Sequence, residues 1–101
     1  MSYFDNNLGV FMGSESASRK YRMELALQNA FSPSHLQLVD ESEKHRGHRG
    51  WNEAGETHFQ LEIESDILKQ KSRVAANQAI YKLLEGEFST GLHAISIKVI
   101  Y

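Results

Sequence analysis

Residues 56–64 read ETHFQLEIE, and the regular alternation of side chains along this stretch governs the predicted architecture. One set of positions, mostly apolar, consists of Thr57, Phe59, Leu61 and Ile63. The intervening polar set consists of His58, Gln60, Glu62 and Glu64. Because successive side chains of a β-strand point to opposite faces, the stretch predicts a strand with one face in the core and one in water. We expect His58 to be either an exposed residue of this strand or a hydrogen-bond partner of the preceding loop.

Two further strands are predicted on either side of this one. Residues 35–41 (HLQLVDE) place Leu36 and Leu38 on one face, and a polar loop that contains glycine, residues 42–55, follows them. Residues 92–100 (LHAISIKVI) predict the last strand. Its inward side chains are expected to be Ile95, Ile97 and Val99.

Two segments have the spacing of amphipathic helices. Residues 14–31 predict one helix, with Ser14 or Ser16 as its N-cap and an end before Pro33. Its apolar stripe is Met23, Leu27, Ala30 and Phe31. After a short connection, residues 65–71, residues 72–88 predict a second helix with Ser72 as its cap. Its apolar stripe is Val74, Tyr81, Leu84 and Phe88, widened by Ile80 and Leu83.

The order helix, strand, strand, helix, strand predicts an α+β fold. Strands joined by a loop should pair antiparallel, and strands joined through a helix should be parallel with a right-handed crossover. Both helices should then cover one face of a three-stranded mixed sheet. We expect one domain, residues 14–101, preceded by a loosely ordered tail, residues 1–13.

Composition narrows the function classes. The chain has 101 residues, a net charge of −2 and no cysteine. Cysteine nucleophiles, disulfides and thiolate metal sites built from this chain alone are therefore excluded. No apolar run reaches the roughly 20 residues that span a bilayer, and the first residues lack the basic region of a secretory signal. We expect a cytoplasmic protein with no membrane partner. No catalytic motif is present, so we expect neither an enzyme nor a small-molecule substrate.

Three of the five histidines lie between residues 43 and 59. His45 and His48 have a His-x-x-His spacing, which is typical of metal sites but weak as a lone pair. Structural zinc sites need four ligands and favour thiolates, so a self-contained zinc site is not expected. Each loop histidine has an ordinary alternative as a solvated side chain. His93 has the parity of the inward row of the last strand, where a half-buried histidine would close the end of the core.

Nucleic-acid binding is the main alternative. Gly47 and Gly50 form a Gly-x-x-Gly, the loop that KH domains use to clamp a nucleic-acid backbone. Here, however, it joins two strands rather than two helices, which argues against that role. A basic surface of the second helix would give salt-dependent DNA binding, or would attract an acidic partner. Its residues are Lys69, Lys71, Arg73 and Lys82.

Three ordered motifs resemble those of the BolA proteins, and the resemblance covers residues 20 to 100. The first is DES at residues 40–42, with His45 three residues on. The others are GETHF at residues 55–59 and GLHAISI at residues 91–97. One departure lies at residues 76–78, where many family members carry Arg-His-Arg and this chain has Ala-Asn-Gln, so a role of those basic residues does not carry over.

The resemblance implies a fold similar to the second class of KH domain and a heterodimer with a monothiol glutaredoxin. It implies a [2Fe-2S] cluster shared between the two proteins, with thiolates from the glutaredoxin and from glutathione. The ligands from this chain would be His93 and the loop residue His45, with His48 as the alternative. The implied role is iron–sulfur cluster trafficking or iron and redox regulation. Some family members are also described as DNA-binding transcriptional regulators of stress or morphology.

Overall fold

The computed structural model describes residues 18–101. The elements are α2 (Arg19–Phe31), β1 (His35–Asp40), the 3-10 turn η1 (Ser42–His45), β2 (His58–Glu64), α3 (Asp66–Lys69), α4 (Arg73–Leu83), α5 (Glu85–Ser89) and β3 (Ala94–Ile100). The predicted tail, residues 1–13, and the predicted caps Ser14 and Ser16 lie outside the described residues. None of the helices in the described part of the chain is long and apolar enough to cross a membrane.

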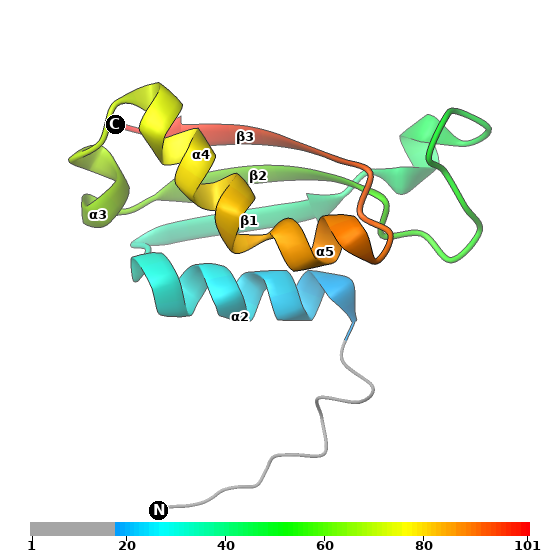
Figure 1. Ribbon diagram of the computed structural model, residues 1–101, viewed down its shortest axis with the longest axis horizontal. Coiled ribbons are helices and arrows are strands. Elements are labelled where there is room, and N and C mark those ends of the chain that lie inside the picture. The colour runs from blue at the N-terminus through cyan, green and yellow to red at the C-terminus, as the bar shows by residue number, and fades with distance from the viewer. Residues whose placement is uncertain (1–17) are drawn as a thin grey trace, which may run out of the picture.

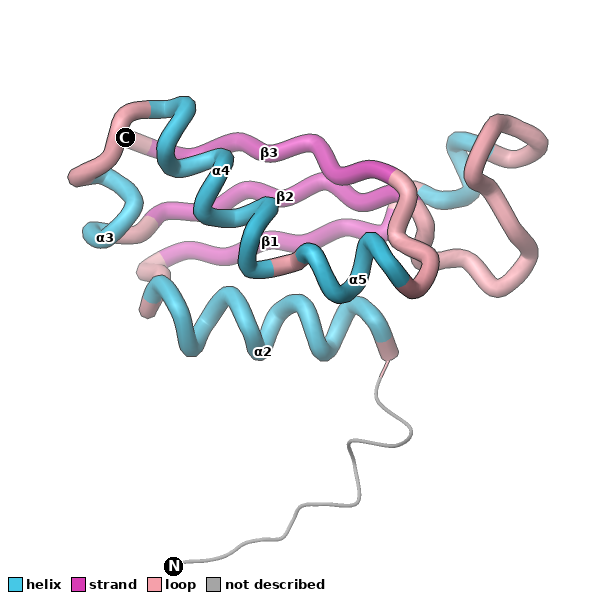
Figure 2. The backbone as a smooth tube through the Cα atoms, viewed as in Figure 1, coloured by secondary structure: helices cyan, strands magenta, loops and turns pink. Residues whose placement is uncertain are grey.

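The three strands form one sheet in the order β1-β2-β3 (Figures 1 and 2). β1 pairs antiparallel with β2, and β2 pairs parallel with β3, as predicted. Leu61 at the centre of β2 is flanked by Leu38 of β1 and Ile97 of β3. The alternating stretch at residues 56–64 therefore contains the central strand of the sheet.

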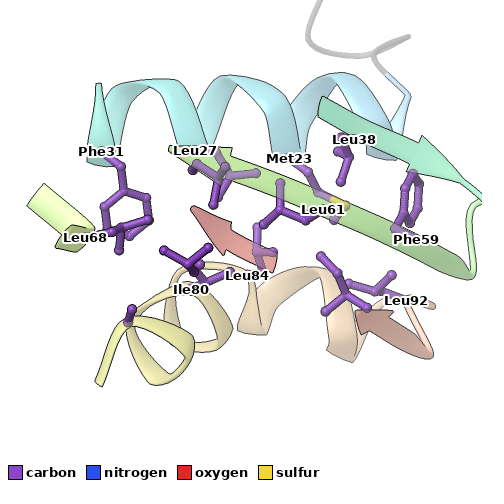
Figure 3. Close-up of a cluster of buried hydrophobic side chains, with 14 residues drawn as sticks. Met23, Leu27, Phe31, Leu38, Phe59, Leu61, Leu68, Ile80, Leu84 and Leu92 are labelled. Atoms are coloured by element: carbon purple, nitrogen blue, oxygen red, sulfur yellow. The ribbon is translucent and has the colours of Figure 1, made fainter. Parts of the chain in front are cut away.

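The core fills the space between the sheet and helices α2, α4 and α5 (Figure 3). The predicted inward residues of β2 are buried, with Leu61 and Ile63 at 0% exposure. On the other face of the same strand, Gln60 is exposed and Glu62 is half-buried. The helices thus cover one face of the sheet and leave the second face in water, as expected from the alternation.

Helix α2 begins later than predicted. Its N-cap is Ser18, whose hydroxyl oxygen accepts a hydrogen bond from the backbone N–H of Tyr21 at 3.1 Å. The carboxylate of Glu56 accepts from the N–H groups of Arg19 and Lys20 at 3.0 and 3.2 Å. These contacts satisfy N–H groups that have no partner within a helix, so they define the start of α2.

The second predicted helix is two helices. Ser72 caps α4 as predicted, with its hydroxyl oxygen accepting from the N–H of Ala75 at 3.1 Å. The chain leaves helical geometry at Leu84, where φ is −97° and ψ is 9°, and α5 follows. The predicted connection, residues 65–71, also contains the one-turn helix α3, which Ser65 caps.

The predicted apolar side chains of the second helix are confirmed in part: Ile80 and Leu84 are buried, and Leu83 and Phe88 pack against the core. The buried side chains are Ala76, Ile80 and Leu84, spaced four residues apart. Val74 is 67% exposed and Tyr81 is 44% exposed. The Tyr81 hydroxyl donates to a β3 carbonyl at 3.1 Å, which holds the ring at the rim of the core. A small alanine was not recognised as the residue closest to the sheet because its apolar signal is weak.

Candidate functional site

Four histidines gather at one end of the sheet, where the long β1–β2 loop projects beyond the strands (Figure 1). His45 ends the turn η1, and His48 follows it in the loop. His58 is the first residue of β2, and His93 immediately precedes β3. The ring centroids are 4.0 Å apart for His45 and His58, 5.2 Å for His58 and His93, and 5.9 Å for His45 and His48.

The parallel pairing of β2 and β3 explains how His93 reaches the loop. His58 and Ala94, the first residues of the two strands, are direct neighbours in the register. The backbone N–H groups of His93 and Ala94 both donate to the Thr57 carbonyl, at 2.8 and 3.1 Å. Segments that are 35 residues apart in the sequence are thereby fixed side by side.

His58 was expected to be an exposed strand residue or a hydrogen-bond partner of the preceding loop. The first alternative is wrong, whereas the second is confirmed at the backbone, because the His58 N–H donates to the Ser42 hydroxyl oxygen at 3.3 Å. His58 does point away from the main core, but it is only 5% exposed because the turn η1 folds back over it. Its ring is stacked on the ring of His45 with an interplanar angle of 9°. Burial lowers the pKa of His58, and positive charge on His45, His93 and His48 lowers it further.

His93 is exposed, whereas a histidine that closed the end of the core would be half-buried. Its ring lies against the backbone of Gly50 in the loop, so closely that a Cβ at Gly50 would overlap the imidazole. Gly50 has φ +83°, a conformation that glycine adopts without strain. The Gly-x-x-Gly of residues 47–50 lies in the β1–β2 loop, as predicted, and its second glycine gives the loop close access to His93.

Hydroxyl and carboxylate side chains beneath the histidines were missed as functional residues. Ser42 and Thr57 are 2% and 1% exposed, and they connect Asp40 to the ring of His58 through hydrogen bonds. The sequence signal was available, because DES and GETHF contain these residues. The contacts between these side chains depend on how the loop folds back onto the start of β2, which the motifs alone do not specify.

Two of the three basic side chains of the loop, Lys44 and Arg46, have local partners. Lys44 pairs with Glu41 at 3.2 Å, and Arg46 pairs with Glu43 at 2.9 Å. The guanidinium of Arg46 also lies over the Trp51 ring, 5.0 Å from its centroid. The loop therefore carries less unbalanced positive charge than its sequence indicates.

The basic set of the second helix lies apart from the histidines. Lys69, Lys71 and Arg73 surround the α3–α4 turn, at the opposite end of the sheet from the loop (Figure 1). Lys69 is paired with Glu64 at 2.7 Å. Arg73 lies over the Tyr101 ring at 4.8 Å. Two of the predicted cations are therefore engaged within the molecule, whereas Lys71 and Lys82 are exposed.

Within residues 18–101, no group of three or more histidine, cysteine or acidic side chains is arranged to hold a metal ion. The four clustered histidines contact one another through ring faces and edges instead.

A comparison with family models identifies the fold family. The model described as BolA, BolA-like protein, matches residues 27–100. The chain belongs to the BolA family. The match covers all three strands and nearly all of the hydrophobic core of this BolA-family chain.

Relatives and solved structures agree with this assignment. SufE-like protein 1 of Arabidopsis thaliana is 43% identical over 79% of this chain, which corresponds to 23% of that longer protein. The DNA-binding transcriptional regulator BolA of Escherichia coli is 34% identical over 75% of this chain and 69% of its own length. The structure of the BolA domain of SufE1 from Arabidopsis thaliana matches with a TM-score of 0.73 and 41% identity, covering 82% of this chain and 91% of that domain. The BolA-like α+β fold, a mixed three-stranded sheet with helices, is confirmed.

Proposed function

We propose that the chain binds a monothiol glutaredoxin as a heterodimer and shares a [2Fe-2S] cluster with it, in iron–sulfur cluster trafficking or in iron and redox regulation. The proposed ligands are His93 and His45. The observation that carries the proposal is the gathering of histidines from three separate segments at one end of the sheet. A binding role of this kind requires no catalytic residue in this chain.

The donor set fits a cluster whose other ligands come from elsewhere. Neutral imidazole nitrogen is a ligand for [2Fe-2S] irons when thiolates complete the coordination. This chain has no cysteine, so the thiolates would be those of the glutaredoxin and of glutathione. His93 is exposed and His45 is half-buried, which leaves both rings open to a partner.

His45 is a better candidate than His48 for the loop ligand. Its ring is held by the stack on His58, and His58 also contacts His93. His48 is exposed, and its ring meets the ring of His45 edge to face, with 5.9 Å between the centroids. The ring contacts run from His48 through His45 and His58 to His93, so His45 is closer than His48 to His93 in this series. His48 remains the alternative ligand if the loop moves on complex formation.

Imidazole ligation would give the cluster two useful properties. Replacing thiolates by neutral imidazoles makes the cluster less negative and raises its reduction potential. A protonated imidazole cannot bind metal, so ligation would weaken at acidic pH. Both properties suit a cluster that is transferred or sensed.

The test is reconstitution of the two proteins with iron, sulfide and glutathione, followed by visible circular dichroism of the mixture. His93→Ala and His45→Ala should each change the spectrum, and His48→Ala should leave it close to that of the unmodified chain. His35→Ala is the matched control, since His35 starts β1 at the opposite end of the sheet and pairs with Glu62. An unchanged spectrum with His93→Ala would remove the ligand assignment.

DNA binding is a second candidate function, favoured by the regulator names of two bacterial relatives and by the exposed lysines Lys71 and Lys82. The other two members of the basic set, Lys69 and Arg73, would contribute after release from their internal partners. Contacts to phosphates would make affinity fall steeply with salt. Salt-titrated binding to duplex DNA should therefore show a shallower slope for Lys71→Ala/Lys82→Ala. The absence of binding at low salt would end this candidate.

A further inference from the structure

A chain of hydrogen bonds connects Asp40, which is exposed, to the buried side chains of Ser42, Thr57 and His58 in the histidine cluster. The Oδ1 atom of Asp40 accepts from the backbone N–H of Ser42 at 2.9 Å and from its hydroxyl at 2.6 Å. An ionised carboxylate has no proton to donate, so the single hydroxyl proton of Ser42 is directed at Asp40. The hydroxyl oxygen of Ser42 can then act toward its other neighbours only as an acceptor.

The neighbours of Ser42 are Thr57 and His58. The Ser42 oxygen accepts from the backbone N–H groups of these two residues, at 2.9 and 3.3 Å, and lies 3.3 Å from the Thr57 hydroxyl. The single proton of the Thr57 hydroxyl can point to the Ser42 oxygen or to the Nδ1 atom of His58, which lies 2.8 Å away. When it points to Ser42, a lone pair of the Thr57 oxygen is available to an Nδ1–H group of His58.

One arrangement of protons gives each of the three side-chain contacts in this chain a donor and an acceptor. Donation runs from His58 to Thr57, from Thr57 to Ser42 and from Ser42 to Asp40. This arrangement places the proton of the neutral His58 ring on Nδ1 and leaves Nε2 without one, because the partner of one ring nitrogen selects the tautomer. The opposite tautomer would leave the Ser42 and Thr57 oxygens facing each other without a proton between them.

We propose that His58 is a positioning residue, held by Asp40, Ser42 and Thr57 in the Nδ1–H tautomer, and that its ring fixes the ring of His45 for cluster binding. The inference rests on the proposed function, because His45 is a ligand only within it. It assigns a role to a buried histidine that is not itself proposed as a ligand.

The geometry of His58 suits a positioning role. Its backbone is tied on both sides, since its N–H donates to Ser42 and its carbonyl accepts from Glu41 at 2.8 Å. His45 lies at the end of η1, a 3-10 turn of four residues, and such turns hold their side chains less firmly than longer helices do. The flat stack at 4.0 Å therefore transfers the fixed orientation of His58 to His45. Ligands whose rotamers are fixed by surrounding contacts bind metal more tightly.

The first test uses the isolated chain, labelled with ¹⁵N and free of iron and glutaredoxin. Long-range ¹H–¹⁵N correlation spectra, recorded above the ordinary histidine pKa of about 6.5, distinguish protonated from unprotonated ring nitrogens. The unmodified chain and Thr57→Ser should both carry the His58 proton on Nδ1. In Thr57→Val, which cannot accept a hydrogen bond, the proton should redistribute toward Nε2.

Thr90→Val is the matched control, because it removes the hydroxyl of an exposed threonine outside the histidine cluster. It should leave the His58 ring signals unchanged. A proton on Nε2 in the unmodified chain would overturn the assignment, and this result needs no variant. The spectra of the unmodified chain and of Thr57→Ser decide the tautomer even if Thr57→Val does not fold.

The second test is visible circular dichroism of the reconstituted mixture with glutaredoxin. Thr57→Val should alter the cluster spectrum, and Thr57→Ser should restore it. A normal cluster spectrum from Thr57→Val, in a chain whose His58 tautomer has shifted, would overturn the positioning role. If the unmodified chain forms no shared cluster, the proposed function fails, and the tautomer assignment is judged by the NMR result alone.

Discussion

At the scale of single residues, the sequence identified the histidines, but it did not predict which of them contact one another or which is buried. The motifs that contain His45, His58 and His93 lie together at one end of the sheet. Alternation could not reveal that His58 is buried, since a period of two assigns a side chain to a face and says nothing about what covers that face. The cover is the turn η1, whose conformation depends on the contacts of Asp40 and Ser42 and not on hydrophobic pattern.

Gly50 provides a prediction at this scale. Gly50→Ala should displace the His93 ring, because the new Cβ would overlap it, and should destabilise the chain by about 1 kcal/mol through backbone strain at positive φ. Gly47→Ala is the control. It has a similar φ of +78°, and a Cβ there would meet nothing within 4 Å.

NMR signals of the His93 ring and urea unfolding measure the two effects separately. Both variants should lose similar stability, and only Gly50→Ala should shift the His93 signals. Equal shifts in the two variants would show that the loop does not pack on His93 in solution.

At the scale of elements, strands were predicted more accurately than helices. The alternation in β2 holds from Phe59 to Glu64, where each buried position carries a large apolar side chain, and it fails at His58, which is also buried. The break at Leu84 and the start of α2 depend on contacts between distant segments, which local patterns do not contain. The N-terminus of α2 is held by Glu56 from the loop, and α5 is tied to α2 through Glu87.

Glu87 gives a prediction with a definite pH dependence. Its carboxylate binds the guanidinium groups of Arg22 and Arg19 at 2.9 and 2.7 Å. The pKa of Glu87 is lowered below its ordinary value of 4.5, and the largest cause is the hydrogen bond from Arg22. A lowered carboxyl pKa stabilises the folded state above pH 4.5, and this contribution is lost as the pH falls toward the folded-state pKa.

Glu87→Gln should therefore lower the free energy of unfolding by about 1 kcal/mol at neutral pH, and the difference should shrink as the pH falls below 4.5. Urea titrations at several pH values measure it. The control is Glu43→Gln, because Glu43 and its partner Arg46 are 71% and 67% exposed and such pairs contribute little. A pH-independent difference for Glu87→Gln would contradict the electrostatic explanation.

At the scale of the whole molecule, the core lies on one face of the sheet, and the two ends of the sheet carry different kinds of side chain. The four clustered histidines and the β1–β2 loop occupy one end of the sheet, and the cations around the α3–α4 turn occupy the other (Figure 1). The topology that separates them was predictable from the order of elements. Which cations remain unpaired was not, because pairs such as Lys69 with Glu64 depend on side-chain geometry.

The one-sided core predicts a contrast between the faces of the sheet. Leu61→Ala, at 0% exposure between β1 and β3, should lower the free energy of unfolding by about 2–5 kcal/mol, because it removes packing at the centre of the core. Val39→Ala on the open face, where Val39 is 37% exposed, should change it by roughly 0.5 kcal/mol. Similar losses in urea unfolding would contradict a core confined to one face.

Ligation of a shared cluster by imidazoles of this chain can be observed by pulsed electron paramagnetic resonance of the reduced mixed complex, with ¹⁵N-histidine in this chain and an unlabelled glutaredoxin. We expect strong ¹⁵N couplings to the cluster. His93→Ala should remove one of these couplings, and His35→Ala should remove none. A cluster spectrum without ¹⁵N coupling would overturn the ligand assignment, since every ligand would then come from the other molecules.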